Sequence, residues 1–113
     1  MAKDSEIKFN IKLNENQVPD LIQWEASDAG EKGVSDAILL QIWDAKDKNT
    51  LRIDLWTKHM LVDDMKLFFH QALLSMSDTF ARATGEEEMA LEMRDFAMHF
   101  GEKMELIKKA EEE

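Results

Sequence analysis

The chain has 113 residues, no cysteine and a formal net charge of −10, from 24 acidic and 14 basic side chains. This length predicts one domain, residues 1–113, and the 44% hydrophobic content is typical of a globular protein. The lack of cysteine excludes disulfides and thiolate metal sites, and the negative charge disfavours nucleic acid as a partner. No apolar run can span a bilayer and the amino terminus lacks a signal-peptide core, so we expect a cytoplasmic protein without membrane insertion.

A first hairpin is predicted near the amino terminus. Apolar and polar residues alternate at about 6–13, as in a strand with one buried face. Residues 14–20 (NENQVPD) form the turn, because Pro19 cannot donate to a strand ladder, and a second strand follows at about 21–26. Residues 27–36 hold two of the four glycines and are predicted to be a loop.

A second hairpin holds the candidate interaction surface. Residues 37–43 (AILLQIW) are apolar nearly all round, so a helix is an alternative, but the short run and the turn that follows favour a strand. The last strand is at about 50–57. An even number of loop residues, for example Lys46–Asn49, places the apolar side chains of both strands on one face. The other face then carries Trp43, Arg52, Asp54 and Trp56.

Two helices are predicted to follow, at about 63–84 and 86–109. Asp63 is expected to cap the first and Gly85 to end it, with His70 at the edge of its apolar stripe. The stripes consist of Met65, Phe68, Phe69, Ala72, Leu73, Met76, Phe80 and Ala83, then Met89, Met93, Phe96, Ala97, Phe100, Met104 and Ile107. The predicted fold class is α+β: a four-stranded antiparallel sheet of two hairpins followed by two C-terminal helices packed on one sheet face.

The chain carries no convincing catalytic motif. It has no nucleophile elbow, phosphate-binding loop or dinucleotide fingerprint. His59 with Asp63, between the last strand and the first helix, is the best candidate for a metal or small-ligand site. His99 lies near Asp95 and Glu102 on one helix face, but a metal there would need a further ligand. We therefore expect no catalytic residue, no metal, no cofactor and no enzymatic activity.

The face with Trp43 and Trp56 has the strongest functional claim. Tryptophan and arginine are enriched at the centres of protein interfaces, and Arg52 and Asp54 lie between the two tryptophans in the sequence. Covering by loop 27–36 or by the first hairpin, or stacking of Arg52 on a tryptophan, are open alternatives. If the face is an interface, a homodimer through the sheets is its simplest form.

The block WDAKDKNTLRIDLWTKHMLVDDMKLFFHQALLSMSDTFARAT, residues 43–84, resembles the gliding motility-associated protein GldC family of Bacteroidota. Weaker similarity includes KFNIKL, QWEASD and MRDFAMHFGEKME. The resemblance implies an accessory protein of gliding motility, without enzymatic activity or cofactor, whose partners are proteins of the gliding or secretion apparatus. The alternatives are a chaperone-like adaptor for a secretion or motility substrate, and a small-ligand or metal-binding domain near His59.

Overall fold

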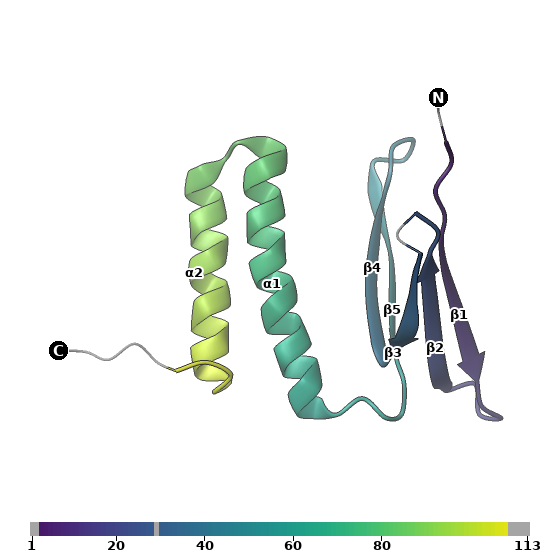
Figure 1. Cartoon of the computed structure of the whole chain (residues 1–113). Helices are drawn as coiled ribbons and strands as arrows, with labels where there is room; N and C mark the ends of the chain where they lie inside the picture. Colours follow the sequence, from purple (N-terminus) through teal and green to yellow (C-terminus); the bar gives the residue numbers. More distant parts are fainter. Residues whose placement is uncertain (1–2, 29, 109–113) are drawn as a thin grey trace. The chain divides into compact units, whose positions relative to one another are not determined.

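The computed structural model describes residues 3–28 and 30–108 of the chain. In chain order, its elements are β1 (Ile7–Leu13), β2 (Pro19–Ala26), β3 (Glu31–Ser35), β4 (Ala37–Asp44), β5 (Asn49–Trp56), α1 (Val62–Thr84) and α2 (Glu87–Lys103) (Figure 1). The predicted α+β class is confirmed. The chain divides into two compact units, residues 1–60 and residues 61–113, which we call the strand unit and the helix unit.

The strand unit holds two antiparallel sheets, so the prediction of a single four-stranded sheet was wrong. One sheet has three strands in the order β1-β2-β3, and the other consists of β4 and β5. The extra strand, β3, lies in the segment 27–36 that was predicted to be a loop. Gly33 opposes Trp24 in this sheet, and indole atoms lie 3.0–3.2 Å from where a Cβ on Gly33 would stand. The indole fills the space beside the glycine, so a glycine-containing segment forms an edge strand.

The turn between β1 and β2 is shorter than predicted, and Pro19 opens β2 instead of ending the turn. The Asn14 side-chain oxygen accepts the backbone N–H groups of Asn16 and Val18 at 2.8 and 3.1 Å. Gln17 takes the left-handed conformation, with φ of 64°. Proline is tolerated here because the first residue of a strand can leave its donor position unused.

The chain passes from one sheet to the other at Asp36. The residues before and after it are joined by a hydrogen bond, in which the Ser35 hydroxyl donates to the Ala37 carbonyl at 2.6 Å. Beyond β5, the Thr57 N–H donates to the Asp36 carbonyl at 2.8 Å and the Lys58 N–H donates to the Pro19 carbonyl at 3.3 Å. The segment after β5 therefore ties the corner to the start of β2, as expected where a strand changes sheets.

The β4–β5 ribbon confirms the predicted strands and faces, with a small shift in the loop. Its connection is residues 45–48 instead of 46–49, an even number as required. Leu40 opposes Ile53, and Gln41 opposes Arg52 on the other face. The strand interpretation of residues 37–43 is therefore correct.

The helix unit departs from the prediction at two of its helix ends. Leu61, not Asp63, is the N-cap of α1, and no side chain caps that end. Gly85 ends α1 as predicted, with φ of 75° and its N–H bonded to the Ala81 carbonyl. α2 ends at Lys103, not at residue 109, and Lys109 lies outside the described residues.

The early end of α2 is a Schellman-type cap formed without glycine. Glu105 has φ of 61°, and its N–H donates to the Glu102 carbonyl at 3.1 Å. The Leu106 N–H reaches back to the Gly101 carbonyl at 2.8 Å. Because glutamate rarely takes this conformation, no residue near position 105 indicates that the helix stops there. Packing of the helices on a sheet face stays a prediction.

α1 and α2 lie antiparallel and pack against each other, and their most buried residues are small or polar (Figure 1). The buried residues of α2 are Ala90, Ala97 and Gly101, and those of α1 are His70 and Ser77. His70 Nδ1 lies 3.0 Å from the Ala97 carbonyl oxygen, to which a protonated Nδ1 donates. His70 is therefore enclosed between the helices, not at the edge of a stripe as predicted.

Candidate functional site

The candidate surface predicted from sequence, Trp43, Arg52, Asp54 and Trp56, lies on one face of the β4–β5 ribbon, and we call it the tryptophan face. Trp43 is 63% exposed and Trp56 is 55% exposed. Between them, Arg52 Nε lies 3.5 Å from Asp54 Oδ2. Two large aromatic side chains and an exposed ion pair are thus held on a regular backbone, where neighbouring strands fix their directions.

The two tryptophans share a face but lie near opposite ends of it. Trp43 opposes Thr50 beside the 45–48 loop, and Trp56 opposes Ala37 beside the corner. Six ladder positions separate them, which at a rise of about 3.3 Å per residue amounts to about 20 Å. A partner that contacts both must therefore cover the length of the ribbon.

The opposite face of the ribbon was predicted to be core, and its outer part is open in the structure. Ile42, Leu51 and Ile53 are 48%, 54% and 47% exposed. A two-stranded ribbon has little stability by itself, and packing of another surface against its exposed apolar side chains would stabilise it. The alternating pattern identified these residues as apolar but gave no signal that the strand unit itself would leave them exposed.

His59, the best metal candidate, pairs with Asp20 in the strand unit. Lys58 Nζ and His59 Nε2 lie 3.2 and 3.4 Å from the same oxygen, Asp20 Oδ1. The hydrogen bond and charge of Lys58 chiefly lower the pKa of Asp20, and His59 adds to this effect. Asp20 was not a predicted partner, because β2 and the segment after β5 are far apart in the sequence.

The geometry around His59 is that of a surface ion-pair cluster. The side chains of Asp20, Lys58 and His59 are 45%, 51% and 59% exposed, and such pairs contribute little to stability. Within residues 3–28 and 30–108, no group of three or more His, Cys, Asp or Glu side chains is placed to hold a metal ion. Neither Asp63, in the first turn of α1, nor His99 belongs to such a group.

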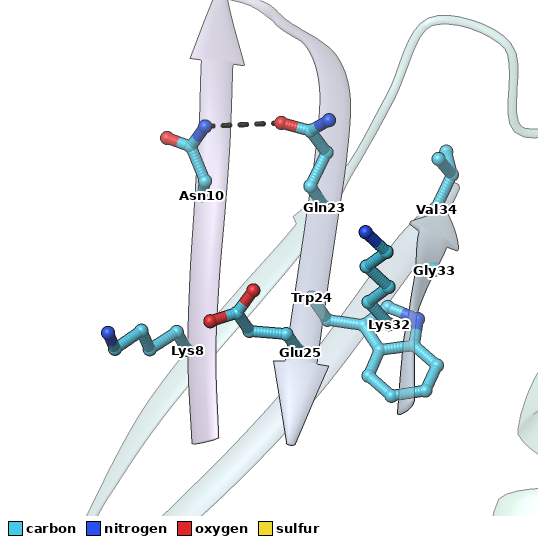
Figure 2. Close-up of a pocket in the computed structure, with 8 residues that line it drawn as sticks. All are labelled: Lys8, Asn10, Gln23, Trp24, Glu25, Lys32, Gly33 and Val34. Atoms are coloured by element: carbon cyan, nitrogen blue, oxygen red, sulfur yellow. Dashed lines mark hydrogen bonds between the residues drawn. The ribbon is translucent and has the colours of Figure 1, made fainter. Parts of the chain in front are cut away.

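A shallow hollow lies on the β1-β2-β3 sheet (Figure 2). Polar side chains of β1, β2 and β3 line it together with Trp24, Gly33 and Val34, and Asn10 donates from Nδ2 to Gln23 Oε1 at 3.2 Å. The polar ones are Lys8, Asn10, Gln23, Glu25 and Lys32. The arrangement is that of a sheet face on which long polar side chains surround a half-buried indole.

The helix unit leaves the centres of its predicted apolar stripes open. Phe69 and Met76 of α1 are 42% and 49% exposed, and Met89 and Phe96 of α2 are 51% and 54% exposed. The fully buried residues of α2 are Ala90, Ala97 and Gly101, of which Ala97 belongs to the predicted stripe. The helices therefore meet along one edge of that stripe, at small residues spaced by seven and four.

Comparison with known proteins identifies the family. The family model described as gliding motility-associated protein GldC-like matches residues 19–106. The chain belongs to the GldC-like family. The match runs from β2 through α2 and includes the whole tryptophan face of this GldC-like chain, which is thereby associated with gliding motility. No curated protein and no solved structure matches it.

In the described part of this GldC-like chain, no helix combines the length and the apolar character that crossing a bilayer requires.

Proposed function

We propose that this GldC-like chain is a non-enzymatic, cytoplasmic accessory protein of gliding motility that acts by binding another protein through the tryptophan face. The observation that carries the proposal is the exposure of Trp43 and Trp56, at 63% and 55%, on one face of a regular ribbon. Exposed large aromatics on a fixed backbone are what protein interfaces use as anchors, because they bury much area at little entropic cost.

The available area is sufficient for each tryptophan to act as an anchor. Burying a further ~100 Å² of indole at about 25 cal/mol per Å² stabilises a complex by about 2.5 kcal/mol. That is the size of effect by which alanine substitution defines an interface hot spot, about 2 kcal/mol or more. Arg52 and Asp54 between the anchors add directional polar contacts, which favour one register of the partner along the ribbon.

The partner we favour is a protein of the gliding or secretion apparatus with a basic surface, because the chain carries a net charge of −10. A second copy of the chain, bound through the ribbon, is the competing partner, because twofold assemblies are the commonest oligomers. Self-association must overcome repulsion between two acidic chains, which makes it weaker at low salt than at high salt.

The experiment replaces both anchors in a gliding bacterium that encodes this chain. The Trp43→Ala/Trp56→Ala variant is compared with Val34→Ala, an exposed apolar side chain of β3 that serves as the matched control. We expect the double variant to lose most single-cell gliding speed while the control keeps it, at equal protein levels and equal circular dichroism. Normal gliding of the double variant would refute the role of the tryptophan face.

The oligomeric state of the purified chain separates the two partners. We expect sedimentation to show a monomer at all salt concentrations tested. A dimer that Trp43→Ala/Trp56→Ala dissociates would instead assign the face to a second copy.

A further inference from the structure

Within the helix unit, α1 and α2 leave a second apolar surface exposed, which we call the hairpin face. Phe69 and Met76 of α1 and Met89 and Phe96 of α2 are all exposed. Leu73 lies one helical turn from Phe69 and from Met76, so the three side chains follow one stripe of α1. A hollow lined by Leu73, Met89, Glu92, Met93 and Phe96 joins that stripe to α2. Both helices therefore present their apolar side chains to the same side of the hairpin.

The four exposed side chains lie outside the most buried part of the contact between the two helices. The fully buried residues there are His70 and Ser77 of α1 and Ala90, Ala97 and Gly101 of α2, with His70 bonded to the Ala97 carbonyl. Leu73 and Met93 are half-buried at the edge of this contact, whereas Phe69, Met76, Met89 and Phe96 remain exposed. The hairpin face is thus apolar surface in excess of what holds the hairpin together.

We propose that the hairpin face binds a basic amphipathic helix of another protein, laid over the hollow between α1 and α2. The hollow follows α2 from Met89 to Phe96, about two helical turns, and α2 as a whole supports a helix of about 26 Å, from 17 residues at 1.5 Å each. Methionine lines such hollows well, since its flexible thioether adapts to different apolar side chains. Met89 and Met93 line the hollow from α2, and Met76 lies exposed one turn beyond Leu73 on α1.

Charge selects a basic partner over an acidic one. Residues 61–108 contain ten acidic and five basic side chains, a net charge of −5. Glu92 lines the hollow itself, and Glu88 lies one turn before it on α2. Lysines that flank the apolar face of a bound helix would meet these carboxylates, whereas a second copy of the chain would bring like charges together.

The test uses a fluorescent peptide of 17 residues, the length of α2, made of leucine at i, i+3, i+4 and i+7 and lysine elsewhere. We expect saturable binding to the full chain, measured by fluorescence anisotropy. A peptide of the same composition with leucine scattered round the helix, and one with glutamate replacing lysine, should each bind at least tenfold more weakly. Equal binding of either control peptide would overturn the proposal.

Matched variants locate the site. Phe96→Glu should weaken binding of the basic amphipathic peptide more than tenfold, and Met89→Glu should do the same if Phe96→Glu disturbs folding. Leu91→Glu, at an α2 side chain that is 58% exposed and not part of the hollow, should change it less than twofold. Binding unaffected by Phe96→Glu and Met89→Glu, or a homodimer that Phe96→Glu dissociates, would overturn the proposal. Because these variants leave Trp43 and Trp56 in place, the outcome is independent of the tryptophan face.

Discussion

The close approach of His70 to Gly101 allows a substitution whose effect should change sign with its background. A Cβ added at Gly101 would stand 2.6 Å from His70 Cε1 and 2.9 Å from Nδ1. Side-chain carbons do not approach this closely, so the imidazole would have to move. Movement would disturb its bond to the Ala97 carbonyl, which is 3.0 Å long and buried between the helices.

The expected change in the free energy of unfolding follows from one stabilising and two destabilising effects. Replacing glycine by alanine in a helix stabilises it by up to about 1 kcal/mol. Overpacking of a close contact costs about 1–3 kcal/mol, and loss of a buried hydrogen bond costs about 1 kcal/mol more. Gly101→Ala should therefore destabilise the chain by roughly 2 kcal/mol. With the imidazole removed by His70→Ala, the same substitution should be neutral or stabilising by up to about 1 kcal/mol.

The assay is urea unfolding followed by far-UV circular dichroism, which reports the helices, for the four proteins of the double-mutant cycle. Gly85→Ala is the control, because Gly85 has φ of 75° and nothing within 4 Å of its added Cβ. It should cost about 1 kcal/mol through the left-handed backbone alone, equally with and without His70. Gly101→Ala values that agree in the two backgrounds would refute the proposed contact.

Two further predictions concern the corner of the strand unit. Thr57 is 2% exposed, and its hydroxyl donates to Asp36 Oδ1 and accepts from the His59 N–H. Thr57→Val should therefore destabilise the chain by about 1–3 kcal/mol in urea unfolding, because two hydrogen bonds at a buried position are lost. A change near zero would contradict this role. Lys58 chiefly lowers the pKa of Asp20 from its ordinary value of 3.8. The Asp20 carboxylate therefore stabilises the fold at pH values above its unfolded pKa, and this stabilisation is lost as the pH falls through its folded pKa. NMR titration should place the Asp20 midpoint below 3.8 and move it upward in Lys58→Ala, and an unchanged midpoint would refute the assignment to Lys58.

The local signals in the sequence were enough for most elements of the fold. Alternation identified β1, β2 and β5, and the short length of the apolar run and the turn after it identified β4. Gly85 marked the end of α1, and matching the apolar sides of β4 and β5 gave the correct faces of the ribbon. β3 was missed because its stability depends on the cross-strand contact between Trp24 and Gly33, which no local pattern contains. The division into two sheets was missed for the same reason, since the corner at Asp36 is held by bonds to Thr57.

The candidate site was predictable in its members but not in its spacing. Any even number of residues in the β4–β5 loop places Trp43 and Trp56 on the same face. Their separation of six ladder positions follows from the actual register. The pairing of His59 with Asp20 could not be predicted, because it arises where the end of β5 meets the start of β2.

The tryptophan face and the hairpin face both carry large apolar side chains that are exposed, although such residues at regular spacing in a sequence are typical of a buried core. In the described residues, the buried hydrophobic side chains are Ile22, Ala90 and Ala97. Many larger apolar side chains are half-buried, and others in both units are at least 40% exposed, among them Trp43, Trp56, Phe69 and Phe96. Periodicity identifies side chains whose removal from water lowers the free energy, but it does not specify which molecule covers them. For this chain, substitutions at exposed apolar positions should therefore affect binding more than folding, whereas substitutions at the His70–Gly101 contact and at Thr57 should do the reverse.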